Sequence, residues 1–172
     1  MSNYRIFLSI LLLFSHSVWA NSDCIDQAAK CFQINPLLIK SIIWQESHFK
    51  GNATHINDNG TQDIGLMQIN SIHLPELTKM GLSAAELKNN RCANVFSGAK
   101  ILHDIIKQDG YSWDAIGKYH SATPNYKNAY LISLIHIIKD RTLTQQLRNT
   151  HIEMTTPEKI DKIFLPLCGF VE

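Results

Sequence analysis

Two carboxylates of this 172-residue chain, Glu46 and Asp63, stand in contrasting sequence environments. Glu46 closes the apolar stretch 42–46, Ile-Ile-Trp-Gln-Glu, whereas Asp63 follows the polar segment 57–62 and opens a strand marked by Gly65. Apolar surroundings raise the pKa of a carboxyl by desolvation, and polar surroundings leave it ionised. Cleavage of a glycosidic bond needs both states, a protonated acid and a negative charge opposite it. The pair therefore predicts a glycosidase with Glu46 as its acid.

Asp63 has two interpretations. Its charge would stabilise an oxocarbenium-like centre, and within about 5–5.5 Å of Glu46 it would provide the geometry of a retaining enzyme. The alternative is a hairpin aspartate that accepts hydrogen bonds from local N–H groups. We take the catalytic role as the prediction.

The elements that must position these residues are mostly helices. Asn35-Pro36 is typical of a helix start, and that apolar helix should end near residues 47–49. Asp58-Asn59-Gly60 indicates a hairpin between short strands. The chain is therefore expected to form a mainly α domain with a small hairpin after its second main helix. Other helices are predicted over 23–32, from a capping box at 82–86, over 94–107 and 112–120, and from Thr123-Pro124 and Thr156-Pro157.

Residues 1–20 are predicted to be a cleavable signal peptide, because Arg5, the apolar stretch 6–14 and a small-residue site at 18–20 follow one another. The apolar stretch is too short for a comfortable span of ~20 residues, although an uncleaved anchor is the alternative. Residues 21–172 form the expected single domain, exported and without a stable membrane span. Removing Arg5 from a net charge of +1 leaves 1 − 1 = 0, which lacks the basic surface of a nucleic-acid binder.

Four cysteines follow the predicted signal peptide, as is typical of an oxidising compartment. If 23–32 is helical, Cys24 and Cys31 lie about 10.5 Å apart along the axis, beyond the ~7 Å that a disulfide spans. Two disulfide pairings remain. We favour Cys24–Cys92 with Cys31–Cys168 over the crossed pairing, and free thiols are the alternative to both. No Cys-x-x-Cys occurs and the histidines are scattered, so no metal site is predicted.

Three segments, Trp44–Ser47, Gly65–Asn70 and Ala115–Tyr119, together resemble the motifs of the lytic transglycosylase (SLT/lysozyme-like) family in order and approximate spacing. The resemblance covers about 24–130 and is nearest to the small exported muramidases associated with type III secretion, conjugation and type IV pilus systems. It implies an α+β lysozyme-like fold, peptidoglycan glycan strands as substrate and no cofactor. The run 63–71 is also similar to c-type lysozymes.

Matched to these motifs, Glu46 is the catalytic acid, and Ser47 is the neighbouring serine whose hydroxyl would orient the carboxyl. Tyr119 would line the cleft and hydrogen-bond the acid or the sugar. Tyr130, better spaced than Tyr126, would complete the cleft wall. Alternatively, Ser47 is an ordinary polar residue at a helix end. The alternative for Tyr126 and Tyr130 is packing in the core.

Four further residues are predicted to bind substrate. Gly65 fits a strand position that a sugar ring or another backbone approaches closely. Gln68 offers amide donors and an acceptor to an N-acetyl group, and Asn70 either contacts sugar or holds the hairpin end. The family pattern Tyr-Asn-Ala-Gly is replaced here by Tyr-His-Ser-Ala, so His120 either contacts substrate or caps the short helix.

Trp113 is expected to pack in the core.

The resemblance implies a periplasmic lytic transglycosylase that cleaves the β-1,4 bond between N-acetylmuramic acid and N-acetylglucosamine and leaves a 1,6-anhydro product. It would open the wall locally for a secretion, conjugation or pilus machine. One alternative is a lysozyme-type hydrolase, which Asp63 favours. The other is a non-catalytic wall-binding adaptor, against which the intact Glu46 argues. The divergent tail, 142–172, is expected to dock a partner or to shape one end of the cleft.

Overall fold

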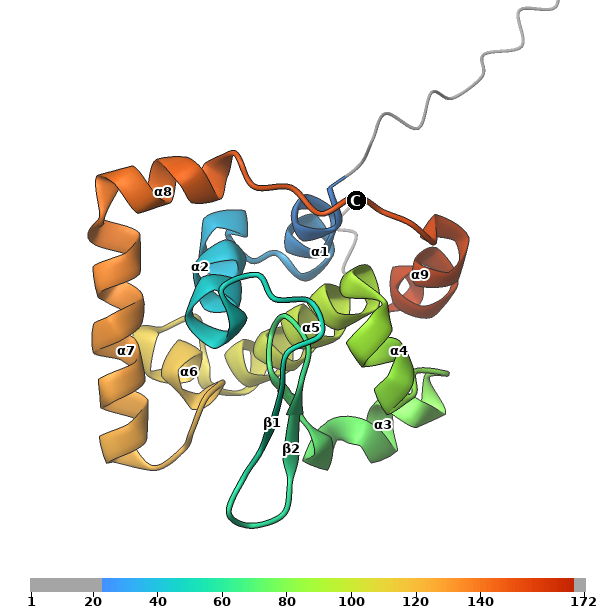
Figure 1. The fold of residues 1–172 in the computed structure, drawn as a ribbon, viewed down its shortest axis with the longest axis horizontal. Coiled ribbons are helices and arrows are strands. Elements are labelled where there is room, and N and C mark those ends of the chain that lie inside the picture. The colour runs from blue at the N-terminus through green and yellow to red at the C-terminus, as the bar shows by residue number, and fades with distance from the viewer. Residues whose placement is uncertain (1–22, 169–172) are drawn as a thin grey trace, which may run out of the picture.

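The computed structural model describes residues 23–168, so the predicted signal peptide lies outside the described residues. Helices dominate this part of the chain and a small antiparallel sheet interrupts them, which confirms the mainly α, α+β lysozyme-like fold class (Figure 1). None of these helices is long and apolar enough to cross a bilayer. The helices are α1 (Cys24–Phe32), α2 (Pro36–Ser47), α3 (Leu74–Lys79), α4 (Ala84–Asn89), α5 (Arg91–Asp109), α6 (Trp113–Lys118), α7 (Pro124–Lys139), α8 (Arg141–Arg148) and α9 (Pro157–Phe164).

The sheet follows α2 directly and carries Asp63. Its strands β1 (Thr54–Ile56), β2 (Gln62–Ile64) and β3 (Ile69–Asn70) pair in sequence order, all antiparallel. Asp63 lies opposite His55 on one side and Asn70 on the other. The predicted hairpin is confirmed, although Asp63 occupies the middle of β2 and does not open it. Its side chain is therefore fixed by neighbours on both strands.

Local capping signals account for most helix boundaries. The Asn35 side chain accepts a hydrogen bond from Leu37 N, and Ser83 forms the predicted capping box. One boundary was wrong: α5 begins at Arg91, capped by Asn90, and not at 94. Two helices were missed, α3 because no side chain caps its first turn and α8 because its sequence is largely polar.

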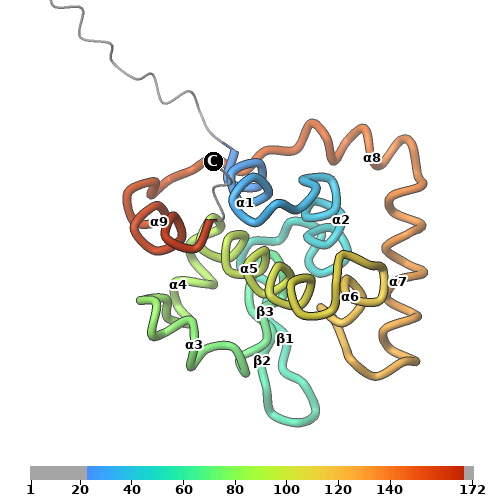
Figure 2. Tube along the Cα trace, turned by 180° about the vertical axis from the view of Figure 1, so that it is seen from behind, coloured from blue at the N-terminus to red at the C-terminus, as the bar shows by residue number. Residues whose placement is uncertain are grey.

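Helix α5 runs through the middle of the molecule, with α1 and α2 on one side and the sheet on the other (Figures 1 and 2). Its residues 92–102 are all buried, and Phe96 packs in a cluster of aromatic rings with Phe32 of α1 and Phe164 of α9. Trp113 was wrongly expected in this core. At the start of α6 it is 48% exposed.

Two disulfides hold α1 to distant parts of the chain. Cys24 pairs with Cys92 at a Cα–Cα distance of 5.4 Å, and Cys31 pairs with Cys168 at 4.5 Å. The favoured pairing is thus confirmed and the crossed pairing excluded. The second disulfide closes a separation of 137 residues and attaches the segment after α9 to the first helix.

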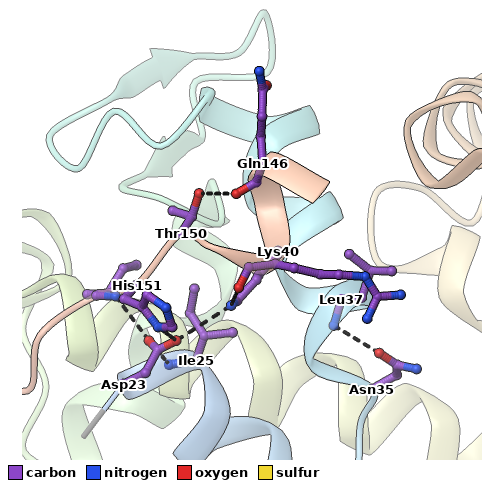
Figure 3. A network of polar contacts seen from close by, with 10 residues as sticks. Asp23, Ile25, Asn35, Leu37, Lys40, Gln146, Thr150 and His151 are labelled. Atoms are coloured by element: carbon purple, nitrogen blue, oxygen red, sulfur yellow. Dashed lines mark hydrogen bonds and ion pairs between the residues drawn. The ribbon is translucent and has the colours of Figure 1, made fainter. Parts of the chain in front are cut away.

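A buried ion pair fastens the tail to the two N-terminal helices (Figure 3). Asp23 Oδ2 lies 3.6 Å from Lys40 Nζ, and both side chains are almost fully buried. Lys40 Nζ also donates to the Arg148 carbonyl at the end of α8, and Ile152 N donates to Asp23 Oδ1. His151 Nδ1 lies 3.2 Å from Asp23 Oδ2. Because buried charges need partners, this network fixes α1, α2 and the chain after α8 relative to one another.

Replacing Asp23 by alanine should therefore lower the free energy of unfolding by about 3–5 kcal/mol, because Lys40 would be left buried without its counter-charge. Urea denaturation of the purified protein measures this loss. Asp26→Ala, at an exposed position of the same helix, should change stability by less than about 0.5 kcal/mol. Equal losses in the two variants would contradict the role given to the buried pair.

Candidate active site

A cleft of about 680 Å³ lies between the end of α2, the sheet and the turn after α6. Most of the predicted site residues meet there, but Ser47, Gly65 and Tyr130 do not line it. The predicted residues that do are Glu46, Asp63, Gln68, Asn70, Tyr119 and His120.

Glu46 occupies the last turn of α2 and faces the cleft. Burial raises the pKa of its carboxyl from 4.5 to about 7, hydrogen bonding with Tyr130 opposes the rise, and the negative charge of Asp63 adds to it. The apolar sequence around Glu46 predicted this direction. A carboxyl with such a pKa is substantially protonated near neutral pH and can give its proton to a leaving oxygen.

Asp63 is held by two side-chain amides. Asn57 Nδ2 donates to its Oδ2 at 3.0 Å, and Asn70 Nδ2 donates to its Oδ1 at 2.7 Å. The same two amides contact Thr61 Oγ1, so the hairpin forms one polar cluster around the carboxylate. These bonds match the alternative interpretation, a hairpin aspartate bonded to local N–H groups, with side-chain amides as the donors. Asn70 thus holds the hairpin and also lines the cleft.

Tyr130 reaches the acid from α7. It is only 5% exposed, and burial raises the pKa of its hydroxyl well above the usual value, so it stays a neutral donor. The hydroxyl approaches Glu46 closely enough to lower the carboxyl pKa, yet it meets no partner at full hydrogen-bond geometry among the described residues. The His120 ring stacks flat on Tyr130, with centroids 4.7 Å apart. Tyr126, 66% exposed, lines the cleft instead.

The turn between β2 and β3 is buried, so its backbone groups need hydrogen-bond partners. Asn94, fully buried in α5, supplies two of the contacts and a third to the carbonyl of Leu87 in α4. Its Nδ2 donates to the carbonyls of Ile64 (2.8 Å) and Leu87 (3.0 Å), and its Oδ1 accepts from Met67 N (2.8 Å). The sequence analysis missed Asn94. An asparagine on the apolar face of a long helix was the available signal.

Ser47 and Tyr119 also bind this turn, although other partners were expected for their hydroxyl groups. The Ser47 hydroxyl was expected to orient the Glu46 carboxyl, but it donates to the Leu66 carbonyl at 2.8 Å. The Tyr119 hydroxyl was expected to bond the acid or the sugar, but it donates to the Met67 carbonyl at 2.8 Å. Both side chains therefore act on the two candidate carboxylates only indirectly, through the backbone.

Gly65 lies in this turn and not in a strand, with φ +76°. A Cβ there would lie 2.2 Å from Asn94 Nδ2 and 2.8 Å from the Leu87 carbonyl, so the protein itself makes the close approach. Gln68 Nε2 donates to the carbonyls of Gly65 (2.7 Å) and Ala53 (3.3 Å). Its side chain still lines the cleft, where its carbonyl oxygen can accept a bond from substrate.

Among the described residues, one group could offer three metal ligands: Asp23, Asp26 and His151, whose ligand atoms lie within 4.8 Å of one another. Asp23 is already paired with Lys40, and the group lies at the start of α1, outside the cleft. We therefore assign no metal to it. Three carboxyl groups line the cleft itself, those of the exposed Asp58 and of the partly buried Glu46 and Asp63.

Comparison with known proteins gives one consistent family. The model of the transglycosylase SLT domain matches residues 23–131. The chain is 44% identical to invasion protein IagB of Salmonella typhimurium (strain SL1344) over 121 residues, which are 70% of this chain and 74% of that protein. It is 37% identical to protein IpgF of Shigella flexneri over 117 residues (68% and 76%) and 36% identical to X polypeptide of Escherichia coli (strain K12) over 114 residues (66% and 68%). The domain match ends within α7, before α8 and α9.

Asn94→Ala should lower the free energy of unfolding by about 3 kcal/mol or more, because it removes hydrogen bonds from two buried carbonyls, those of Ile64 and Leu87, and from the buried Met67 N–H. Urea denaturation gives the value. Asn128→Ala, at an exposed position of α7, is the matched control and should cost less than about 0.5 kcal/mol. A similar small loss in both variants would show that the turn does not depend on Asn94.

The raised pKa of Glu46 gives a second prediction. The carboxyl is neutral in folded and unfolded chains below pH 4.5, and stability is lost as the pH rises from there through about 7, where the folded chain ionises. Glu46→Gln, which stays neutral, should match the wild type at pH 4 and exceed its stability at pH 8 by up to about 3 kcal/mol.

Urea denaturation of both proteins at pH 4, 6 and 8 measures this difference. Glu158→Gln, at an exposed position of α9, should leave the pH dependence of the wild type unchanged. Parallel stability curves for Glu46→Gln and wild type at all three pH values would mean that the carboxyl is not desolvated.

Proposed function

Because the chain belongs to the transglycosylase SLT family, we propose that it is a lytic transglycosylase that cleaves the β-1,4 bond between N-acetylmuramic acid and N-acetylglucosamine in peptidoglycan. The observation that carries this proposal is the Glu46 carboxyl, with a pKa raised to about 7, in a cleft that also holds the Asp63 carboxylate. Polar side chains of the hairpin, among them Asn57, Asn59 and Thr61, line the cleft, as a glycan chain requires. Gln68 and Asn70 would contact its N-acetyl and hydroxyl groups.

In the first step, Glu46 gives its proton to the glycosidic oxygen and the bond to C1 of the muramic acid breaks. Positive charge develops on the sugar ring as the leaving group departs. Asp63 stabilises this charge electrostatically, because its carboxylate is already oriented by Asn57 and Asn70 and need not reorganise. The substrate's own N-acetyl group can assist at C1.

In the second step, Glu46 acts as a base. Its carboxylate removes the proton from the C6 hydroxyl of the same muramic acid, and the C6 oxygen bonds to C1, which gives the 1,6-anhydro ring. The carboxyl ends the cycle protonated, as it began. Tyr130, a neutral donor beside Glu46, would stabilise the carboxylate between the two steps and so make the first transfer easier.

The second candidate is a lysozyme-type hydrolase, in which Glu46 would activate water in place of the C6 hydroxyl. Asp63 favours it, because a second carboxylate is the arrangement of retaining glycosidases. However, both Asp63 oxygens accept hydrogen bonds from amides, which disperses their charge and weakens them as nucleophiles. This supports electrostatic stabilisation over a covalent intermediate, and we keep transglycosylation as the proposal.

We also propose that the protein works in the periplasm after removal of residues 1–20. The two disulfides support an oxidising compartment. The name of one relative, an invasion protein, supports service to an envelope-spanning machine that needs local gaps in the wall.

Mass spectrometry of the muropeptides released from purified peptidoglycan tests the activity. The mature protein should release 1,6-anhydro products, and Glu46→Gln should release none. Asp63→Asn should be slower by roughly a hundredfold, as is typical when one preorganised charge is lost. Asp26→Asn, an exposed substitution of the same kind on α1, should leave the rate unchanged.

Two other outcomes of this experiment would change the proposed function. Products with reducing ends would make the protein a hydrolase. Binding to the wall by the folded protein without any release of products would favour the wall-binding adaptor.

A further inference from the structure

A second hollow, of about 740 Å³, lies between α3, α5 and α9. Four lysines line it, and among the described residues around it Glu76 is the one carboxylate. We call this hollow the lysine groove. Its lysines are Lys79, Lys100, Lys159 and Lys162.

Two of the four lysines are neutralised within the protein. Lys100 Nζ is bonded to Glu76 at 2.6 Å and to Asp104 at 2.7 Å. Lys159 is paired with Glu86. These two therefore shape the groove without offering a free charge to a ligand.

Lys79 and Lys162 have no ion-pair partner among the residues that the structure describes, and both are exposed. They come from two different helices that line the groove, Lys79 from the end of α3 and Lys162 from the last turn of α9. The surface between them is partly apolar, with Met80 and Ile163 packed against the core and Leu167 43% exposed. Such a groove suits a short anionic chain that carries small apolar side chains.

The lysine groove adjoins one end of the catalytic cleft. His73 lines the cleft, and Glu76, less than one helical turn further on, lines the groove. In the same way Ile101 lines the cleft and its neighbour Lys100 lines the groove, so the two hollows share a wall. Both views place α3 and α9 at the same end of the molecule, away from α7 (Figures 1 and 2).

We propose that the lysine groove binds the stem peptides of peptidoglycan, so that peptide-substituted glycan strands are the preferred substrate. The inference rests on the proposed function, because it places a glycan in the adjoining cleft. Stem peptides carry free carboxylates and alanine methyl groups, and a stem of about four residues reaches roughly 13 Å when extended. The carboxylates would pair with Lys79 and Lys162, and the methyl groups would lie on the apolar surface between them.

The tail supplies one wall of this groove. Lys159 and Lys162 belong to α9, which lies beyond the part of the chain that matches the family model. The Cys31–Cys168 disulfide and the ring cluster around Phe164 hold α9 in place. The groove would thus give the tail a role in choosing the substrate, although none of the described tail residues lines the cleft itself.

Binding to peptidoglycan sacculi tests this inference without the need for cleavage. Glu46→Gln protein, which leaves the glycan intact, is cosedimented with sacculi before and after an amidase removes the stem peptides. It should bind the peptide-bearing sacculi up to roughly tenfold more tightly, and the Lys79→Gln, Lys162→Gln double variant should lose most of this preference. Each lysine should account for about two- to fivefold, as partly exposed ion pairs do.

The control is Lys139→Gln, an exposed lysine of α7 far from the groove, which should keep the full preference. Salt should weaken the preference by screening. An equal preference in the double variant and its Glu46→Gln parent, or no preference in the parent, would overturn the proposal and leave the groove to an acidic protein partner. If the wild type binds with this preference but releases no products, the proposed activity fails and the peptide-binding groove stands.

Discussion

The buried turn between β2 and β3 must have its backbone polar groups hydrogen-bonded, and the molecule meets this requirement with side chains from three helices. Ser47 of α2, Asn94 of α5 and Tyr119 at the end of α6 bind the carbonyls or N–H groups of residues 64–67. Because Ser47 follows Glu46 and the turn follows Asp63, these bonds also set where the two carboxyls stand relative to each other. The geometry of the active site is therefore a consequence of satisfying a buried backbone.

The two carboxyls differ because their supporting elements differ. Glu46 ends a helix whose other faces are buried, so little water and few donors reach it, and its pKa rises to about 7. Asp63 projects from a hairpin built of asparagine, threonine and glycine, where amides surround its oxygens. An acid and a fixed negative charge thus coexist in one cleft. The local sequence around each group supplies the difference, and the turn brings the two groups together.

The tail after α7 is attached by a different kind of interaction. A buried ion pair between Asp23 and Lys40, with Arg148 and Ile152 bonded to it, and the Cys31–Cys168 disulfide join it to α1 and α2. Most of the tail's own helical faces are polar, so packing alone gives it less support than it gives α5. This attachment places Lys159 and Lys162 of α9 along the lysine groove.

How far the sequence determined the protein can be seen residue by residue. Short-range rules were sufficient for the Asn35 and Ser83 caps, the hairpin at Gly60, and Glu46 as a desolvated acid, because each depends on a few neighbours in the chain. The helical spacing of Cys24 and Cys31 excluded their bond to each other, but the fold decided between the two remaining pairings. Only the tertiary structure showed that Ser47, Tyr119 and Asn94 bind a buried turn, and that α9 forms a groove with α3. Hydrogen bonds and surfaces of that kind join residues far apart in sequence, and no local pattern specifies which distant carbonyl a hydroxyl or amide will meet.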